Sequence, residues 1–487
     1  DAAARLTDLT VSGASGSPTP FSFSYDADDM LTQAGDLTLN YDAQTGLIND
    51  TTLDNTTDSW SFNPFTELNS YSAAYNSADV FAVQYGRDDL GRITQKVETV
   101  SGQTVTTTYS YDAAGRLETE TVNGNNIATY TYDSNGNRLS DGTNNAAYDD
   151  QDRLLQYGSA SYSYTANGEL LTKTVGGQTT AYTYDVLGNL VGVTLPNSDQ
   201  ITYLIDGDNR RIGKLVNGTL VQGFLYQDGL NPVAELDGNG DIVSLFIYAS
   251  QSNVPDYMIK NGIKYRIISD HLGSPRLIIN SQTGVVAQEM HYTGFGQVTQ
   301  NTTPNFQPFG FAGGLYDTDT SLVRFGARDY DAENGRWTTK DPIKFASYST
   351  NHYTYLGSEP INHTDLSGLI CGTGACVAVG IGAVRATQIG WRIYNAYKAG
   401  QAAASIANSL PNISPSDDAS SGTQGSEEPG SCSADNTEDS ESGDEGGTRG
   451  GSQPNIGAGR PKWEDILRNG PKKIGPSTPG KGGSRGR

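Results

Sequence analysis

A short unit that pairs tyrosine with aspartate repeats along the first half of the chain, and this repeat most constrains the fold. The unit has an aromatic residue, any residue and Tyr-Asp. A turn with Gly or Asn follows, then Arg or Asn, Leu and a polar stretch. Copies centre on Tyr25, Tyr41, Tyr85, Tyr111, Tyr132, Tyr148, Tyr164, Tyr184 and Tyr226. From Tyr111 to Tyr226 they follow one another at 16 to 21 residues, apart from a degenerate copy, YLIDGDNRRIG, that keeps the phase. This regularity favours a repeat architecture over an ordinary β-sandwich.

The physical chemistry of the unit predicts strands and tight turns. Tyrosines at positions i and i+2 share one face of a strand, so their rings are expected to stack against copies in neighbouring strands. The Asp-x-x-Gly segment supplies side-chain-to-backbone hydrogen bonds and a residue that tolerates positive φ, which reverses the chain. One hairpin cannot bury its own face, so the units must add side by side into a long curling sheet.

Composition supports an all-β protein and excludes several kinds of function. The 487 residues include 58 Gly and 28 Tyr but only 3 Met, 4 His and 3 Cys, which is typical of turn-rich β structure. A net charge of −23 argues against nucleic-acid binding by the bulk of the chain and suits a secreted surface. The cysteines all follow Leu369 and have no zinc spacing. The histidines also lack metal spacing, so no cofactor is expected, and His271 is expected to serve the DHLGS turn.

The stretch from Ile267 to Leu369 carries the residues with catalytic potential. It contains SDHLGSP, YTGFGQV, GLYD, ARDYD, GRW, DPI and DLSGL in that order. Hydrolysis of a peptide by carboxylates needs two of them close together, one protonated and one ionised. Asp341 and Asp365 are 24 residues apart, so only tertiary folding could pair them. Arg328 and Arg336 are candidate arginines, and Arg336 is expected to serve packing or an ion pair.

These motifs resemble a known family. The repeat is similar to the YD (tyrosine-aspartate) repeat of Rhs and teneurin-type proteins, and the stretch 267–369 resembles the Rhs repeat-associated core domain. Together the two resemblances cover about residues 15 to 369. They imply a β-strand spiral that forms a hollow shell around the polypeptide that follows it. The core, 267–369, would close one end of the shell built by 1–266.

The resemblance also implies an activity. Rhs-type cores are aspartyl autoproteases that cut directly after the Leu of a closing Asp-Pro-x-Gly-Leu motif. Carried over, Asp341 and Asp365 would be the catalytic carboxylates, Arg328 would lower a carboxylate pKa or stabilise an oxyanion, and Leu369–Ile370 would be the scissile bond. Here the closing motif is Asp-Leu-Ser-Gly-Leu, without the proline. The alternative is a structural cap whose aspartates serve turns.

The chain after Leu369 divides into three segments by composition. Residues 370–410 are apolar and favour a helix, either packed against the inner shell wall or acting on a membrane during translocation. Residues 411–458 form an acidic, Ser- and Gly-rich linker, which is expected to be disordered. Residues 459–487 are basic; a solvated tail is favoured over one that contacts nucleic acid. None of these residues is His, which argues against a His-dependent nuclease or hydrolase.

The sequence therefore predicts a secreted polymorphic toxin of the Rhs type. Its shell would enclose its own C-terminal polypeptide and release it by self-cleavage after Leu369. Components of a secretion system and a cognate immunity protein are further expected partners. The alternatives are a cell-surface adhesion or recognition protein without cleavage, and a structural array in a wall or matrix.

Overall fold

The computed structural model describes residues 5–344 and 349–369, all within one unit that comprises residues 1–411. These residues form β-strands and short turns of 3-10 helix, η1 (Phe311–Gly313) and η3 (Leu356–Ser358), and no α-helix occurs among them. The prediction of an all-β shell is thereby confirmed. The expected apolar segment 370–410, the acidic linker 411–458 and the basic tail 459–487 lie outside the described residues.

Four antiparallel sheets account for the strands, and within each sheet the strand order equals the chain order. The first sheet comprises β1 (Asp8–Val11), β2 (Thr19–Tyr25), β3 (Leu31–Ala34), β4 (Leu37–Tyr41), β5 (Ile48–Leu53), β6 (Thr56–Phe62), β7 (Leu68–Tyr75), β8 (Ala78–Arg87), β9 (Ile93–Val100), β10 (Gln103–Tyr111), β11 (Leu117–Val122) and β12 (Asn125–Thr129). The second pairs β13 (Thr131–Tyr132) with β14 (Arg138–Ser140).

The third sheet is the longest. It comprises β15 (Ala146–Tyr148), β16 (Leu154–Tyr157), β17 (Ala160–Tyr164), β18 (Leu170–Val175), β19 (Gln178–Tyr184), β20 (Leu190–Thr194), β21 (Gln200–Ile205), β22 (Arg211–Val216), β23 (Thr219–Tyr226), β24 (Pro232–Leu236), β25 (Ile242–Ile247), β26 (Tyr257–Lys260), β27 (Ile263–Ser269), β28 (Pro275–Asn280), β29 (Val286–Tyr292) and β30 (Val298–Asn301). The fourth comprises β31 (Leu315–Asp317), β32 (Leu322–Phe325), β33 (Arg328–Asp331) and β34 (Arg336–Trp337). The boundary placed at 266/267 falls inside β27, and the sheet continues through it.

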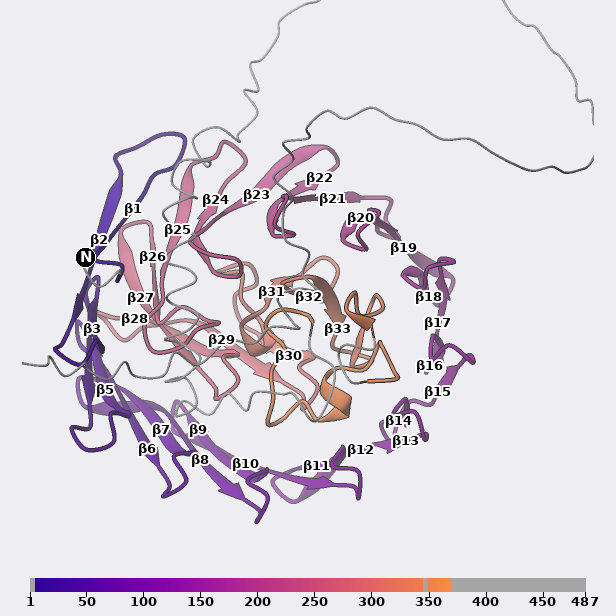
Figure 1. Ribbon diagram of the computed structural model, residues 1–487, viewed down its shortest axis with the longest axis horizontal. Coiled ribbons are helices and arrows are strands. Elements are labelled where there is room, and N and C mark those ends of the chain that lie inside the picture. Colours follow the sequence, from indigo (N-terminus) through magenta and orange to yellow (C-terminus); the bar gives the residue numbers. More distant parts are fainter. Residues whose placement is uncertain (1–4, 345–348, 370–487) are drawn as a thin grey trace, which may run out of the picture. The chain divides into compact units, whose positions relative to one another are not determined.

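The strands follow a curved path and return to lie beside their own beginning (Figure 1). Backbone hydrogen bonds join the β1–β2 loop to the β24–β25 loop, with Ala14 N donating to Gly240 O at 2.8 Å. A buried ion pair joins β27 to β6, with Arg266 Nε 2.6 Å from Asp58 Oδ2. Apolar residues of β24–β28 share one buried cluster with those of β2–β11. The strand path is therefore a spiral whose later strands pack against its first.

Each repeat is built around its aspartate. Asp112 Oδ1 accepts hydrogen bonds from the backbone N–H groups of Ala114, at 2.9 Å, and Arg116, at 3.0 Å. The Nε of Arg116 donates to Asp112 Oδ2 at 2.7 Å, and its guanidinium lies 4.6 Å from the ring centre of Tyr132 in the next repeat. The Tyr132 hydroxyl donates to Leu117 O at 2.6 Å. The same arrangement of Asp, Arg and Tyr recurs at Asp88, Arg92 and Tyr111, and at Asp206, Arg210 and Tyr226.

This geometry differs from the ring-on-ring stacking expected for the paired tyrosines. The register shifts between Ser110 and Tyr111 and again between Thr131 and Tyr132. These irregularities take the second tyrosine of each pair out of the regular pleat. Its ring then rests on an arginine and its hydroxyl binds the preceding repeat. The repeat is therefore a chain of hydrogen bonds and cation–π contacts from one turn to the next.

The core sheet β31–β34 and the segment 349–369 lie inside the curved path of the strands (Figure 1). Charged side chains fasten the core sheet to the repeats: Arg211 contacts Asp329 at 2.8 Å, and Lys214 contacts Asp317 at 2.8 Å. Its own centre is aromatic, with Phe311, Phe325, Tyr330, Trp337 and Tyr355 buried together. The core is thus a small, separately packed layer held by the surrounding sheet.

Two expectations about single side chains are resolved by these contacts. Arg336 donates to Asn137 Oδ1 at 2.8 Å and lies 4.8 Å from the ring centre of Tyr148, which makes it a packing residue. The side chain of His271 was expected to stabilise the DHLGS turn, but Asp270 Oδ1 accepts the N–H groups of that turn instead. The Nε2 of His271 lies 2.7 Å from Ile361 O and ties β27–β28 to the core segment.

Candidate active site

Arg328 occupies the centre of the candidate site. It begins β33, directly after the tight turn that joins it to β32, and its side chain is 1% exposed. The guanidinium carbon lies 4.0 Å from the ring centre of Trp337. A cation on an aromatic face is stabilised and held in one plane. Trp337 therefore helps to hold the arginine in place.

The two predicted catalytic aspartates meet at this arginine. Asp341 Oδ2 and Asp365 Oδ2 each lie 3.2 Å from Arg328 Nη2. Both aspartates are fully buried, with 1% and 0% of their surface exposed. Tertiary folding therefore brings together two aspartates that are 24 residues apart in the sequence. The two carboxylates therefore share one cation.

Asp341 is positioned by the chain that follows β34. Its Oδ1 accepts the N–H of Ile343 at 2.9 Å, and its own N–H donates to His352 O at 3.1 Å. The same His352 carbonyl accepts a hydrogen bond from Arg328 Nη1 at 3.4 Å. Burial lowers the pKa of the His352 side chain. The backbone of His352 thus aligns Asp341 with Arg328.

Asp365 is positioned by a short segment, 365–369, that we call the strap. Asp365 Oδ1 accepts hydrogen bonds from Ser367 Oγ and from the N–H of Leu369, each at 3.1 Å. Arg328 Nε donates to the carbonyl oxygen of Gly368. The N–H of Ala327 donates to Ser367 O at 2.9 Å. The strap therefore brings the backbone of Gly368 and Leu369 directly to the charged groups.

Two glycines allow the strap to lie against the β32–β33 turn. A Cβ on Gly326 would fall 2.4 Å from Ser367 O, and one on Gly368 would fall 2.4 Å from Phe325 O. Both glycines also have positive φ, +40° and +67°, a region that other residues rarely adopt. Sequence reasoning missed Gly326, Ser367, Trp337 and the His352 backbone. Ser367 and Gly368 lie inside the DLSGL motif and Trp337 inside GRW, so these motifs were the available signal.

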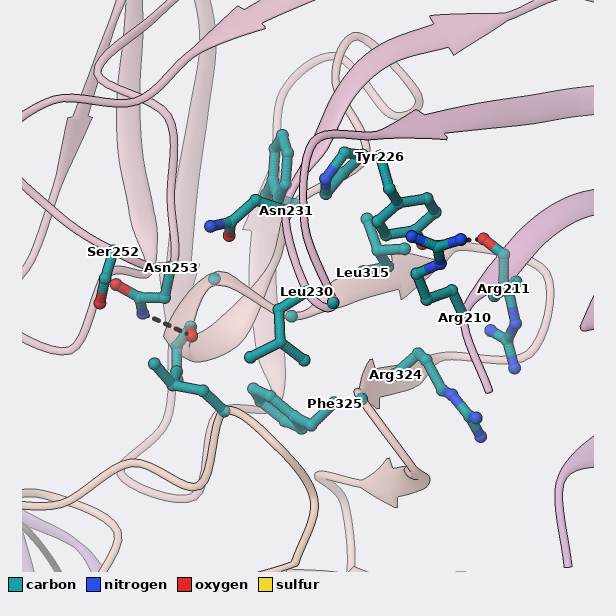
Figure 2. Close-up of a pocket in the computed structure, with 18 residues that line it drawn as sticks. Arg210, Arg211, Tyr226, Leu230, Asn231, Ser252, Asn253, Leu315, Arg324 and Phe325 are labelled. Atoms are coloured by element: carbon teal, nitrogen blue, oxygen red, sulfur yellow. Dashed lines mark hydrogen bonds between the residues drawn. The ribbon is translucent and has the colours of Figure 1, made fainter. Parts of the chain in front are cut away.

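A pocket adjoins the strap (Figure 2). Leu230, Phe325 and Leu366 supply apolar surface, and Asn253 Nδ2 donates to Ala312 O at 2.9 Å across it. The arginines at its rim are already engaged; Arg211 and Arg324, for example, both contact Asp329. Leu366 occupies the position after Asp365, where the closing motif of the Rhs-type core has a proline. It is one of the residues that line this pocket.

The structure brings Arg328, Asp341, Asp365 and Leu369 together, while Ile370 lies outside the described residues. Within residues 5–344 and 349–369, no group of three or more His, Cys, Asp or Glu side chains could hold a metal ion. The same residues include no helix long and apolar enough to cross a bilayer. The site therefore consists of two buried carboxylates and a cation that lie beside the backbone of Gly368 and Leu369.

Comparison with known proteins places the chain among shell-forming proteins. The family model described as Teneurin YD-shell matches residues 1–361. Human Teneurin-4 is 33% identical over 302 residues, covering 58% of this chain and 11% of that protein. The tRNA3(Ser)-specific nuclease WapA of Bacillus spizizenii is 29% identical over 274 residues, covering 53% of this chain and 12% of that protein. The chain thus spans about a tenth of these curated relatives.

Solved structures share the fold. The crystal structure of TcdB2-TccC3-TEV matches with a TM-score of 0.59 at 18% identity, covering 74% of this chain and 21% of that chain. The Tc holotoxin pore of Photorhabdus luminescens matches with a TM-score of 0.59 at 16% identity, covering 77% of this chain and 22% of that one. At these identities the likeness concerns the fold alone.

Proposed function

The chain belongs to the Teneurin YD-shell family, and on that premise we propose that it is the shell of an Rhs-type secreted toxin. Its core cuts the peptide bond between Leu369 and Ile370. The polypeptide that follows Leu369 is the cargo, which the shell holds and the cut releases from the chain. One observation carries this proposal: both buried aspartates contact Arg328 Nη2 at 3.2 Å, beside a strap that ends at Leu369.

The reaction is a hydrolysis that consumes one water. Asp365, ionised, accepts a proton from water as the water oxygen attacks the carbonyl carbon of Leu369. Asp341, protonated, donates its proton, which ends on the nitrogen of Ile370 as the C–N bond breaks. The products are a carboxylic acid on Leu369 and an amine on Ile370, and the proton taken up by Asp365 balances the one lost by Asp341. Arg328 holds both carboxylates and is placed to stabilise the negative charge on the tetrahedral intermediate.

The cargo and its partners follow from this proposal. Residues 370–487 would leave the shell, with the apolar stretch 370–410 leading and able to contact a membrane. Delivery components and an immunity protein are the further partners expected of such a toxin. Relatives with toxin-related names, the nuclease WapA and the Tc holotoxin pore, support this assignment. The acidic net charge of −23 supports a shell that does not bind nucleic acid.

Intact-mass analysis of the purified full chain tests the proposal. We expect wild type to give two pieces that co-elute natively, with Ile370 as the new N-terminal residue. Asp365→Asn and Asp341→Asn should each remain one chain. Asp237→Asn is the control, because Asp237 accepts hydrogen bonds from turn N–H groups and from the Asn239 side chain, all within its own turn, and an asparagine can also accept there. An uncut wild type overturns the proposal. A new N-terminus at Leu369 would move the cut to the Gly368–Leu369 bond.

A cell-surface recognition protein without cleavage is the second candidate. The 33% identity to Teneurin-4 is the observation that favours it. This candidate predicts an uncut, folded chain whose Asp341 and Asp365 affect stability alone. The same mass measurement decides between the two functions, because only the toxin shell requires the break after Leu369.

A further inference from the structure

We propose that Ser367 is a positioning residue for the self-cleavage: its hydroxyl holds Asp365 as the ionised carboxylate that accepts the proton of water. The inference rests on the proposed function, keeps the division of roles stated there, and adds a positioning role for Ser367. Asp365 acts as the base, and Asp341 acts as the acid. Ser367 itself touches neither the water nor the carbonyl of Leu369.

The donors around Asp365 carry this inference. Its Oδ1 accepts from the Ser367 hydroxyl and from the N–H of Leu369, each at 3.1 Å, and its Oδ2 accepts from Arg328 at 3.2 Å. The aspartate itself is 0% exposed, so water does not substitute for these donors. Hydrogen bonds donated to a carboxylate stabilise its ionised form. Three donors on one buried carboxylate therefore stabilise the ionised form of Asp365.

The Ser367 hydroxyl is itself fixed in place. The carbonyl of the same residue accepts the N–H of Ala327 at 2.9 Å, at the approach that Gly326 leaves open. Its backbone is therefore anchored to the β32–β33 turn, and its side chain reaches back two residues to Asp365. A proline after Asp365 would restrict the backbone by its ring. Here Leu366 stands in that position, and the Ser367 contact restrains Asp365 in its place.

The division of roles predicts a bell-shaped dependence of cleavage rate on pH. The rate rises as Asp365 ionises and falls as Asp341 loses its proton. Loss of the Ser367 hydroxyl removes a donor from the ionised form, so Asp365 becomes easier to protonate. The rising limb then moves to higher pH, while the falling limb stays in place.

The experiment follows cleavage of the full chain after a short pulse of cell-free translation, with samples shifted to a series of pH values. For Ser367→Ala we expect cleavage about tenfold to a hundredfold slower below the pH optimum, as for the loss of one hydrogen bond to a charged group. The rising limb should move up by about one to two pH units. Ser367→Thr, which keeps the hydroxyl, should restore both rate and profile.

Two controls separate positioning from folding. Thr364→Val removes the hydroxyl of a buried residue just before the strap, and it should leave the profile unchanged. In the uncleavable Asp341→Asn background, Ser367→Ala should melt within a few degrees of its parent. If Ser367→Ala leaves the limb in place, or if threonine fails to restore it, this inference alone is overturned. An uncut wild type overturns the proposed function, and the inference with it.

Discussion

Arg266 on β27 and Asp58 on β6 are 208 residues apart in the chain, yet their side chains meet at 2.6 Å in the interior. The two side chains are 3% and 2% exposed. Asp58 also accepts hydrogen bonds from Tyr71 at 2.6 Å and Thr51 at 2.7 Å. This pair therefore joins the start of the spiral to its later strands, and Arg266 also lies 3.6 Å from Asp256.

Removal of the arginine should destabilise the unit strongly. Arg266→Met leaves Asp58 buried without its cation, and breaking one side of a buried pair costs about 3–5 kcal/mol. Chemical denaturation of the Asp365→Asn chain, which keeps the polypeptide in one piece, measures the loss. Arg5→Ala is the control, because its contact with Asp29 is solvent-exposed and should contribute about 1 kcal/mol or less. If Arg266→Met and Arg5→Ala lowered the free energy of unfolding equally, the Arg266–Asp58 pair would not stabilise the contact between the first and the later strands.

Glu359 should make the stability of the core depend on pH. Burial raises the pKa of Glu359 to about 7, although Asn362 donates to it at 2.6 Å. A raised pKa means that the fold favours the protonated form. Its contribution is present below the unfolded value of 4.5 and is lost as the pH rises to about 7. Over that range we expect a loss of roughly 3 kcal/mol.

The measurement compares thermal melting at pH 5 and pH 8 in the Asp365→Asn chain. Glu359→Gln, which cannot ionise, should melt higher than its parent at pH 8 and show a smaller difference between the two pH values. Glu118→Gln, at an exposed position on β11, should reproduce the parent curve. A Glu359→Gln chain with an unchanged pH difference would contradict the prediction.

The tyrosine hydroxyls should contribute to stability one repeat at a time. Tyr132→Phe removes the hydrogen bond to Leu117 O at 2.6 Å and leaves a carbonyl without that donor, which costs about 1–2 kcal/mol. Tyr265→Phe is the control, since its ring packs against Phe306 and its hydroxyl has no hydrogen bond among residues 5–344 and 349–369. In denaturant unfolding, Tyr132→Phe should have a lower midpoint than wild type, and Tyr265→Phe should have the midpoint of wild type. If Tyr132→Phe left the free energy of unfolding unchanged, the Tyr132 hydroxyl would not stabilise the fold.

Local spacing was sufficient to predict the strands and turns, because each repeat is stabilised largely by contacts within about twenty residues. The Asp112 turn is an example: Asp, Gly and Arg lie within five positions. Long-range ion pairs such as Arg266 and Asp58 could not be predicted from sequence spacing, because any of many acidic residues could have been the partner of Arg266. At the candidate site, resemblance supplied Arg328, Asp341 and Asp365. Ser367 and Gly326 were not predictable because their roles depend on the close approach of two backbones.

Gly326 should be required for cleavage because the strap packs on it. A Cβ at Gly326 would lie 2.4 Å from Ser367 O, so Gly326→Ala should displace the strap and slow self-cleavage severely. Gly124→Ala is the matched control, with positive φ of +80° and nothing within 4 Å of the added Cβ. Both changes cost about 1 kcal/mol from the backbone conformation. Electrophoresis after timed expression should show Gly124→Ala cut as wild type and Gly326→Ala largely intact.

Arg328→Lys should abolish most of the cleavage although it conserves the charge. The guanidinium contacts Asp341, Asp365 and the Gly368 carbonyl at once, and its carbon lies 4.0 Å from the ring centre of Trp337. A lysine ammonium is a single point of charge without this planar fork, so it cannot hold three partners in one geometry. We expect cleavage at least about a hundredfold slower, in line with the loss of a preorganised electrostatic contact. The measurement is the time course of the intact chain, with Arg5→Lys as a control at a partly exposed arginine that also contacts an aromatic ring. If Arg328→Lys cut at the wild-type rate, the forked contacts would have no part in the reaction, and positive charge alone would suffice.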